Sequence, residues 1–191
     1  MDAALAAGIE PVELLRAGEN VLPELLAEVA TLGHAPRVVG VFRREDLPRG
    51  GRAVALALWR VGDPGNVGTL LRAADAFGAA VALSEGCADP LSPRALRASA
   101  GAVFRVPLVA WEDTPRPWLA LVAHGGTPLP EAPLAPPLTF LLGAEREGLP
   151  THLVTKCHMA ITVPLPGKAE SLNVAAAGAI ALYELSRRAA G

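Results

Sequence analysis

The chain has 191 residues, of which 51% are hydrophobic and 19% charged, and its formal net charge is −2. This length predicts one compact domain with an appendage. The apolar content excludes a disordered chain, and the absence of an uncharged run of about 18 residues excludes a membrane-spanning protein.

The first part of the chain looks helical. Short helices are predicted at residues 11–16 and 23–32, because each opens with a proline and ends before a glycine, Gly18 or Gly33. Residues 1–36 hold one arginine against six acids, so this appendage is acidic.

From Arg37 onward, β-rich runs alternate with helical ones. The predicted strands are 37–43, 53–59, 79–83, 103–110, 119–124, 139–143 and 160–165, and the predicted helices are 66–77, 93–99 and 173–188. Apolar strands separated by helices indicate an α/β domain with a mostly parallel sheet flanked by helices. Residues 127–137, with five prolines in eleven positions, are predicted to be a stiff surface connection.

The basic residues concentrate in the middle of the chain. Residues 37–105 hold ten arginines against six acids, and fifteen of the seventeen basic residues are Arg, whose planar fork suits phosphate. A compositional bias of the genome explains such arginine abundance equally well. The charge alone therefore leaves a nucleic-acid partner open.

Cysteine usage and the N-terminus bear on the compartment. Cys87 and Cys157 lie 70 positions apart, without a C-x-x-C pair or a histidine at zinc spacing. We therefore expect neither a disulfide framework nor a bound metal. The opening residues 1–4 lack the basic and long apolar regions of a secretory signal, so the expected location is cytoplasmic.

The first segment that carries chemistry is GDPGNVG, residues 62–68, between a strand and a helix. Its glycines are spaced G-x-x-G-x-x-G rather than G-x-G-x-x-G, and Pro64 stands where a pyrophosphate would approach the backbone, which argues against nicotinamide binding. Asn66 is most simply an N-cap. Arg72, in the following helix, is either a surface charge or an anion contact near the free N–H groups of the helix start.

The second segment is TFLLGAEREGLP, residues 139–150, a buried strand that ends at Gly143. Glu145 lies between the end of the strand and the glycine turn, where a carboxylate can fix a neighbouring loop or a cationic partner. We expect Arg146 and Glu147 to be plain surface charges.

The third segment is ITVPLPGKAESLNVAAAGAIALYEL, residues 161–185. Its prolines and Gly167 force an irregular loop, and Ser171 and Asn173 offer side-chain hydrogen bonds, although either is also explained as a helix cap. The small residues 175–179 permit very close approach of another backbone, within the chain or across a dimer.

In this order and spacing the three segments resemble the motifs of the SpoU/TrmH family of S-adenosylmethionine-dependent RNA 2′-O-ribose methyltransferases, in the SPOUT class. The resemblance covers about residues 53–185. It implies a C-terminal trefoil knot, a homodimer, and an active site near the subunit interface, with no metal required.

The resemblance also implies roles for individual residues. By position, the cofactor contacts fall on Gly143, Val163 and Leu172. The catalytic-site positions fall on Asn66, Arg72, Glu145, Ser171 and Asn173. Because a guanidinium holds its proton so firmly, we expect Arg72 to bind a phosphate or to stabilise negative charge on the acceptor oxygen, rather than to act as a base.

The chain departs from the family in having a short N-terminal part. Residues 1–49 resemble a reduced substrate-binding segment, and residues 50–191 resemble the methyltransferase domain. The predicted substrate is tRNA or rRNA. The alternative is a non-catalytic RNA-binding or assembly module that retains the knotted fold, and no residue decides between a ribose and a base as methyl acceptor.

Overall fold

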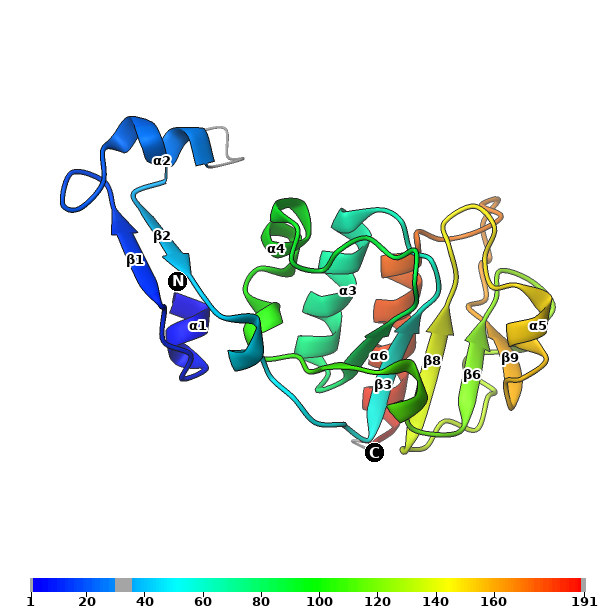
Figure 1. Ribbon diagram of the computed structural model, residues 1–191. Coiled ribbons are helices and arrows are strands. Elements are labelled where there is room, and N and C mark those ends of the chain that lie inside the picture. Colours follow the sequence, from blue (N-terminus) through cyan, green and yellow to red (C-terminus); the bar gives the residue numbers. More distant parts are fainter. Residues whose placement is uncertain (1, 30–35, 190–191) are drawn as a thin grey trace.

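A parallel sheet forms the centre of the molecule (Figure 1). The computed structural model describes residues 2–29 and 36–189. In these ranges seven strands form the sheet in the order β5-β4-β3-β8-β6-β9-β7, and every neighbouring pair is parallel. The strands are β3 (Val54–Leu58), β4 (Ala80–Leu83), β5 (Leu108–Val109), β6 (Trp118–Leu121), β7 (Thr127–Pro128), β8 (Leu138–Leu142) and β9 (Met159–Thr162).

Helices follow the strands in sequence, which confirms the predicted α/β class. They are α1 (Asp2–Ala6), α2 (Pro23–Val29), α3 (Pro64–Ala76), α4 (Pro93–Ser99), α5 (Thr151–Val154) and α6 (Val174–Ala189), with 3₁₀ turns η1 (Arg44–Asp46), η2 (Ala102–Phe104) and η3 (Trp111–Asp113). No described helix combines the length and the apolar character needed to cross a bilayer. The trefoil knot stays a prediction.

The main core lies between one face of the sheet and helices α3 and α6 (Figure 1). Strands contribute buried side chains such as Leu56 and Phe140, and α3 contributes Leu70. At Gly178 of α6, a Cβ atom would lie 2.5 Å from Cδ2 of Leu70, so this close helix contact requires a glycine. The small residues of the third segment therefore serve packing within the chain here.

The opposite face of the sheet carries a smaller aromatic core. Trp118 is buried there with Ala57 and Leu141, and its ring meets that of Trp111 at 6.0 Å. Its indole N–H donates a 2.9 Å hydrogen bond to the hydroxyl of Thr114, which satisfies the one polar atom of the ring.

The proline-rich segment 127–137 lies at the surface, as its composition predicts, but it also contributes to the core. Leu129, Ala132 and Leu134 are all buried, and the segment begins with β7, the last strand of the sheet. Arg188 of α6 donates hydrogen bonds to the carbonyls of Leu129 and Ala132. The composition did not predict these buried positions, at which apolar residues between the prolines pack onto the core.

An ion pair holds Arg188 in this position. Glu184 accepts hydrogen bonds from Arg187 and Arg188, at 2.8 Å for the closest contact with each. These two bonds lower the pKa of Glu184 to about 2. The ion pair therefore persists to a pH well below the ordinary value of 4.5, and it orients Arg188 toward the proline-rich segment.

Residues 2–29 and 36–42 lie beside the main sheet and contain their own two-stranded antiparallel sheet of β1 (Glu13–Arg16) and β2 (Val38–Val41) (Figure 1). The predicted helix at 11–16 is wrong, because residues 13–16 pair with β2 and this pairing overrides local helix propensity. The helix predicted at 23–32 is present as α2, and its predicted last turn and Gly33 lie outside the described residues.

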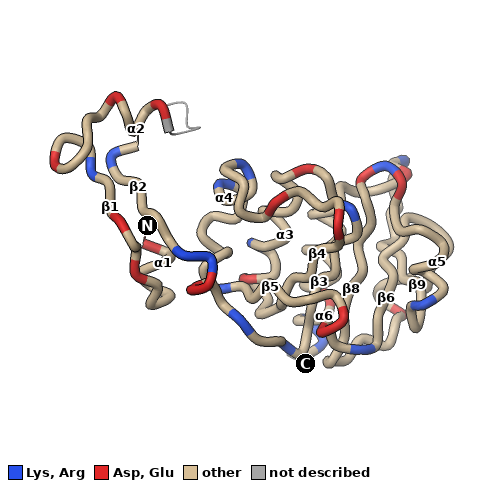
Figure 2. The backbone as a smooth tube through the Cα atoms, in the orientation of Figure 1, with Lys and Arg blue, Asp and Glu red and all other residues tan. Residues whose placement is uncertain are grey.

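This N-terminal part contacts the main domain at η2. The Phe42 and Phe104 rings lie 4.9 Å apart, and a Cβ at Gly101 would lie 2.4 Å from Cβ of Ala3. Figure 2 shows acidic positions along this part and mainly basic ones in the segment that leads to β3. Of the strand predicted at 103–110, the first two residues lie in η2 and only Leu108–Val109 pairs with β4, because Pro107 donates no ladder hydrogen bond.

Candidate functional site

Three loops meet at the carboxyl edge of the sheet, where open α/β sheets bind ligands. Glu145, in the loop after β8, accepts hydrogen bonds from the backbone N–H groups of Gly62 (3.2 Å) and Asp63 (3.1 Å). Its Oε1 also accepts a 2.9 Å bond from Nδ2 of Asn66. Oδ1 of Asn66 in turn accepts a 3.0 Å bond from Nδ2 of Asn173. The three predicted segments are therefore joined by one continuous chain of hydrogen bonds.

Asn66 is not the N-cap that the sequence suggests. Helix α3 begins at Pro64, and the capping residue is Asp63, whose carboxylate accepts the Asn66 N–H at 3.0 Å. Proline suits this first helical position because it needs no N–H there. With the cap supplied by Asp63, the Asn66 amide is free to bridge Glu145 and Asn173.

Asn173 combines the two roles that the sequence left open. Its Oδ1 accepts the backbone N–H groups of Ala175 (2.8 Å) and Ala176 (3.3 Å), as an N-cap of α6 does. Its Nδ2 is the donor to Asn66. The side-chain amide therefore fixes the start of α6 against α3.

The environment of Glu145 keeps it ionised. Burial on its own would raise the pKa of this carboxyl, but hydrogen bonds from Asn66 and from backbone N–H groups outweigh that effect and lower the pKa below its ordinary value. A carboxylate with a lowered pKa and several donors is a weak proton acceptor. Glu145 is therefore suited to hold the loops together rather than to remove a proton.

The lowered pKa predicts a pH-dependent contribution of Glu145 to stability. The stabilisation is fully present above the ordinary value of 4.5 and is lost as the pH falls through the lower folded-state value. We expect Glu145→Gln to lower the melting temperature at pH 7 and to have less effect at pH 3, because below pH 4.5 the unfolded state binds the proton and the stabilisation decreases. Thermal unfolding of both proteins across this range checks the prediction.

Glu147→Gln is the matched control, since Glu147 is exposed in the same loop and makes no hydrogen bond to any described residue. It should shift the melting temperature little at either pH. An equal difference between wild type and Glu145→Gln at pH 7 and pH 3 would contradict the prediction.

Gly143 allows the loop after β8 to turn back on itself. A Cβ atom at this position would lie 2.0 Å from the carbonyl carbon of Gly148 and 2.3 Å from the nitrogen of Leu149. The Gly148 N–H closes the turn by donating to the carbonyl of Ala144 at 2.9 Å, and Gly148 has a φ of 66°. The sequence G-A-E-R-E-G thus places the Glu145 carboxylate on the loop after β3.

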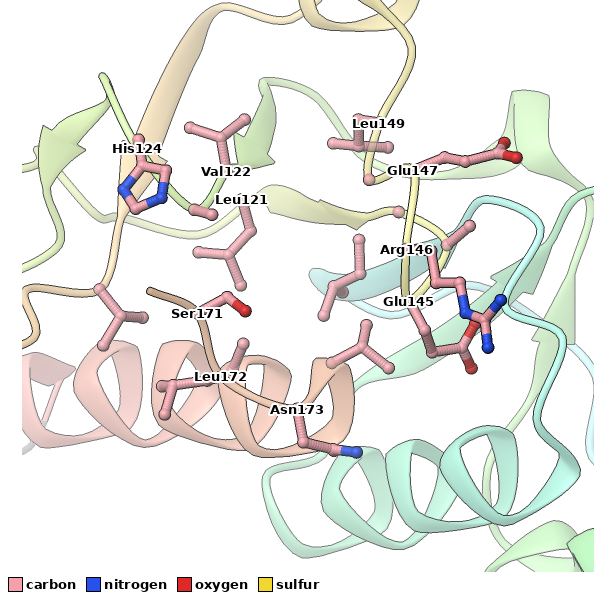
Figure 3. Close-up of a pocket in the computed structure, with 18 of the residues that line it drawn as sticks. Leu121, Val122, His124, Glu145, Arg146, Glu147, Leu149, Ser171, Leu172 and Asn173 are labelled. Atoms are coloured by element: carbon pink, nitrogen blue, oxygen red, sulfur yellow. The ribbon is translucent and has the colours of Figure 1, made fainter. Parts of the chain in front are cut away.

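A cavity of about 580 Å³ lies beside this hydrogen-bonded chain (Figure 3). Its volume is in the range of small-molecule and cofactor sites. All three predicted cofactor positions line it, together with Ser171, Glu145 and Asn173. The further lining residues used below are Leu121, His124, Arg146, Glu147, Leu165 and Glu170.

Two predicted site residues do not line the cavity: Asn66, which is joined to it through Glu145 and Asn173, and Arg72. Arg72 is exposed on α3, six residues beyond Asn66 and therefore about 9 Å further along the helix axis. Its neighbours on the same exposed helix face are Thr69 and Ala76. Its guanidinium makes no hydrogen bond or ion pair with residues 2–29 or 36–189.

The sequence reasoning missed several lining residues. Arg146 and Glu147 were expected to be plain surface charges, yet both line the cavity. His124 lies at the end of the cavity opposite Asn173 and Glu145 (Figure 3). The signal for His124 was available, because it follows β6 at the same carboxyl edge of the sheet as the other loops.

The site has no group suited to a metal ion. Among the described residues, no three His, Cys, Asp or Glu side chains come close enough together to hold one.

Most of the chain is similar to known proteins. The model of the SpoU rRNA Methylase family matches residues 53–183. The 23S rRNA (guanosine(2553)-2'-O)-methyltransferase RlmP of Bacillus subtilis is 39% identical over 136 residues, which are 65% of this chain and 54% of that protein. The chain thus spans about half the length of that relative.

Solved structures match over more of the chain. The SpoU methyltransferase AviRb from Streptomyces viridochromogenes, in complex with AdoMet, aligns with a TM-score of 0.84 and 25% identity, over all of this chain and 87% of that one. The AdoMet-bound rRNA methyltransferase from Sinorhizobium meliloti also aligns with a TM-score of 0.84, at 27% identity, over 98% of this chain and 85% of that one.

Proposed function

The chain belongs to the SpoU rRNA methylase family, and from this premise we propose that it transfers a methyl group from S-adenosylmethionine to a ribose 2′-hydroxyl of RNA. The observation that carries the proposal is the Glu145–Asn66–Asn173 hydrogen-bond chain beside the cavity. This hydrogen-bond chain joins the loops that border the cavity and so holds the walls of the cavity in fixed positions.

The lining of the cavity fits the proposed cofactor. Leu121, Val163 and Leu172 offer apolar surface for the adenine ring, and Gly143 leaves its backbone open to close approach. Carboxylates of Glu145 and Glu170 stand at the cavity and favour a cation. S-adenosylmethionine fits this description, and when bound it supplies an electrophilic methyl carbon on a positively charged sulfur.

The proposed reaction is a single in-line displacement. The 2′-oxygen forms a bond to the methyl carbon while the carbon–sulfur bond breaks, and the hydroxyl proton leaves to solvent or to an acceptor on the RNA. The main demand on the protein is alignment of oxygen, carbon and sulfur. We assign this alignment to the hydrogen-bonded loops, and we assign to Arg72 the task of holding a phosphate or the developing negative charge.

We further propose that the active unit is a homodimer. Helix α6 exposes Ala176, Ile180 and Tyr183 at helical spacing, and Tyr183 is 58% exposed despite its large apolar ring. A second copy would cover this stripe close to the start of α6 and therefore close to Asn173. We assign methyl transfer to residues 50–191. To residues 1–49 we assign an accessory role in binding cytoplasmic tRNA or rRNA. The first substrate to test is rRNA.

The test has two arms on the same protein. Titration calorimetry should show binding of S-adenosylmethionine, and incubation with in vitro-transcribed 23S rRNA and tRNA should yield a 2′-O-methylnucleoside in mass spectrometry of the digested product. Sedimentation of the sample gives its oligomeric state. A base-methylated nucleoside would replace the ribose acceptor in the proposal, and failure to bind the cofactor would overturn it.

A further inference from the structure

Arg60 adopts an unusual backbone conformation next to the site. It follows β3 and has a φ of 51°, in the left-handed region that favours glycine or asparagine and is costly for a long side chain. Such outliers persist where the surrounding structure enforces them, and they cluster at functional sites. The side chain of Arg60 is exposed.

The neighbouring loop holds Arg60 rigidly. Its backbone N–H donates a 2.9 Å hydrogen bond to Oγ of Ser84, which lies just after β4. The next residue, Val61, accepts a 2.9 Å bond at its carbonyl from the N–H of Ala88. The stem of the Arg60 side chain lies over Gly86, where a Cβ would be 3.4 Å from both Cγ and Nε. The guanidinium is therefore presented from a fixed base.

That guanidinium has no internal partner. Arg94 is paired with Asp63 at 2.9 Å and Arg105 with Asp75 at 2.7 Å, whereas Arg60 makes no side-chain hydrogen bond or ion pair in the described part of the chain. Glu85, the acid closest in the adjacent loop, does not pair with it either. A cation held in place without a partner is free for an external anion.

Arg60 lies next to the loop that contacts Glu145, and therefore near the place where we propose that the methyl-accepting nucleotide binds. It lies two residues before Gly62, whose N–H binds Glu145, and Arg72 lies on the helix that follows the same loop. In sequence, Arg60 therefore precedes this loop and Arg72 follows it. We propose that Arg60 binds a phosphate of the RNA substrate beside the acceptor nucleotide, an inference that rests on the proposed function.

The Arg60→Gly variant distinguishes a role of Arg60 in binding RNA phosphate from a role in supporting the fold. Arg60→Gly relieves the left-handed backbone while removing the guanidinium, so we expect the melting temperature to rise by roughly 2 °C. Binding of in vitro-transcribed 23S rRNA should weaken about tenfold at low salt, and the slope of log affinity against log salt should fall by about one. Affinity for S-adenosylmethionine should not change.

Three further variants sharpen the test. Arg60→Asn tolerates the same backbone and should reproduce the RNA-binding defect, whereas Arg60→Lys retains the charge and should keep most of the binding. The matched control is Lys156→Ala, which removes an exposed cation just before β9, at the sheet edge opposite the site and outside the N-terminal part to which RNA binding is assigned.

The outcomes separate the two proposals. Wild-type affinity and salt slope in Arg60→Gly, with normal methylation by wild type, would overturn the role of Arg60 and leave the proposed function standing. A lower melting temperature with unchanged RNA binding would show that Arg60 only supports the fold. If wild type neither binds S-adenosylmethionine nor methylates RNA, the proposed function itself fails.

Discussion

Arg72→Lys should lower the rate of methyl transfer by about 100-fold or more while leaving the affinity for S-adenosylmethionine unchanged. Loss of a single preorganised donor to a developing negative charge typically costs about 10²–10³ in rate. Lysine keeps the charge but loses the planar fork that binds a phosphate or oxyanion through two bonds. The cofactor affinity should not change because Arg72 does not line the cavity. Single-turnover methylation and calorimetry measure the two quantities.

Arg94→Lys is the control for charge-preserving substitution near the site. Arg94 is exposed on α4, and its partner Asp63 accepts a lysine as readily. Its methylation rate should remain close to that of wild type. Near-normal turnover by Arg72→Lys would remove Arg72 from the mechanism, and a joint loss of turnover and cofactor affinity would indicate a disturbed pocket instead.

Gly143→Ala should abolish tight cofactor binding. The new Cβ atom would occupy the space of the Gly148 carbonyl carbon, 2.0 Å away, so the turn from Gly143 to Gly148 must open. Overpacking of this kind costs about 1–3 kcal/mol. We expect S-adenosylmethionine to bind roughly 10- to 100-fold more weakly and the melting temperature to fall, because the displaced loop carries Glu145 away from Gly62 and Asp63.

The control is Gly167→Ala in the loop after β9. A Cβ at Gly167 meets no atom within 4 Å, so the backbone should accept alanine without rearrangement. This variant should bind the cofactor as wild type does. Calorimetry and thermal unfolding on both variants check the comparison, and unchanged affinity in Gly143→Ala would show that the turn does not shape the pocket.

The parallel sheet and its helices follow from local pattern. Buried strands such as β3 and β8 are continuous apolar runs, and α3 carries Leu70, Leu71 and Ala74 at helical spacing. These signals lie within one element and do not depend on the rest of the chain. The predicted boundaries differ by only a few residues for the same reason.

Such local patterns do not predict short elements or the pairing of strands that lie far apart in sequence. Residues 13–16 hold two leucines that suit a helix or a strand equally, and the choice is made by β2, more than twenty residues further along. The proline-rich segment shows the same limit. Its prolines indicate an irregular backbone, but only the position of α6 and Arg188 decides that Leu129 is buried.

The candidate site was predicted in part. The position of Glu145 between the end of a strand and a glycine turn indicated that it fixes a neighbouring loop, and it does so at Gly62 and Asp63. Whether Asn66 caps its helix or bridges to Asn173 depends on which neighbour supplies the cap, and one sequence does not determine that. The roles of Arg72 and Ser171 stay predictions.

The contacts of α6 determine when the pocket exists during synthesis. This helix is made after every strand of the main sheet, yet it supplies the amide that joins Asn66 and the guanidinium that secures the proline-rich segment. A nascent chain leaves the ribosome with its N-terminus first. The strands of the sheet therefore emerge before α6, the last helix that packs against them. A growing polypeptide on the ribosome should therefore be unable to retain a ligand until α6 has left the exit tunnel, which separates translation from enzymatic competence in time.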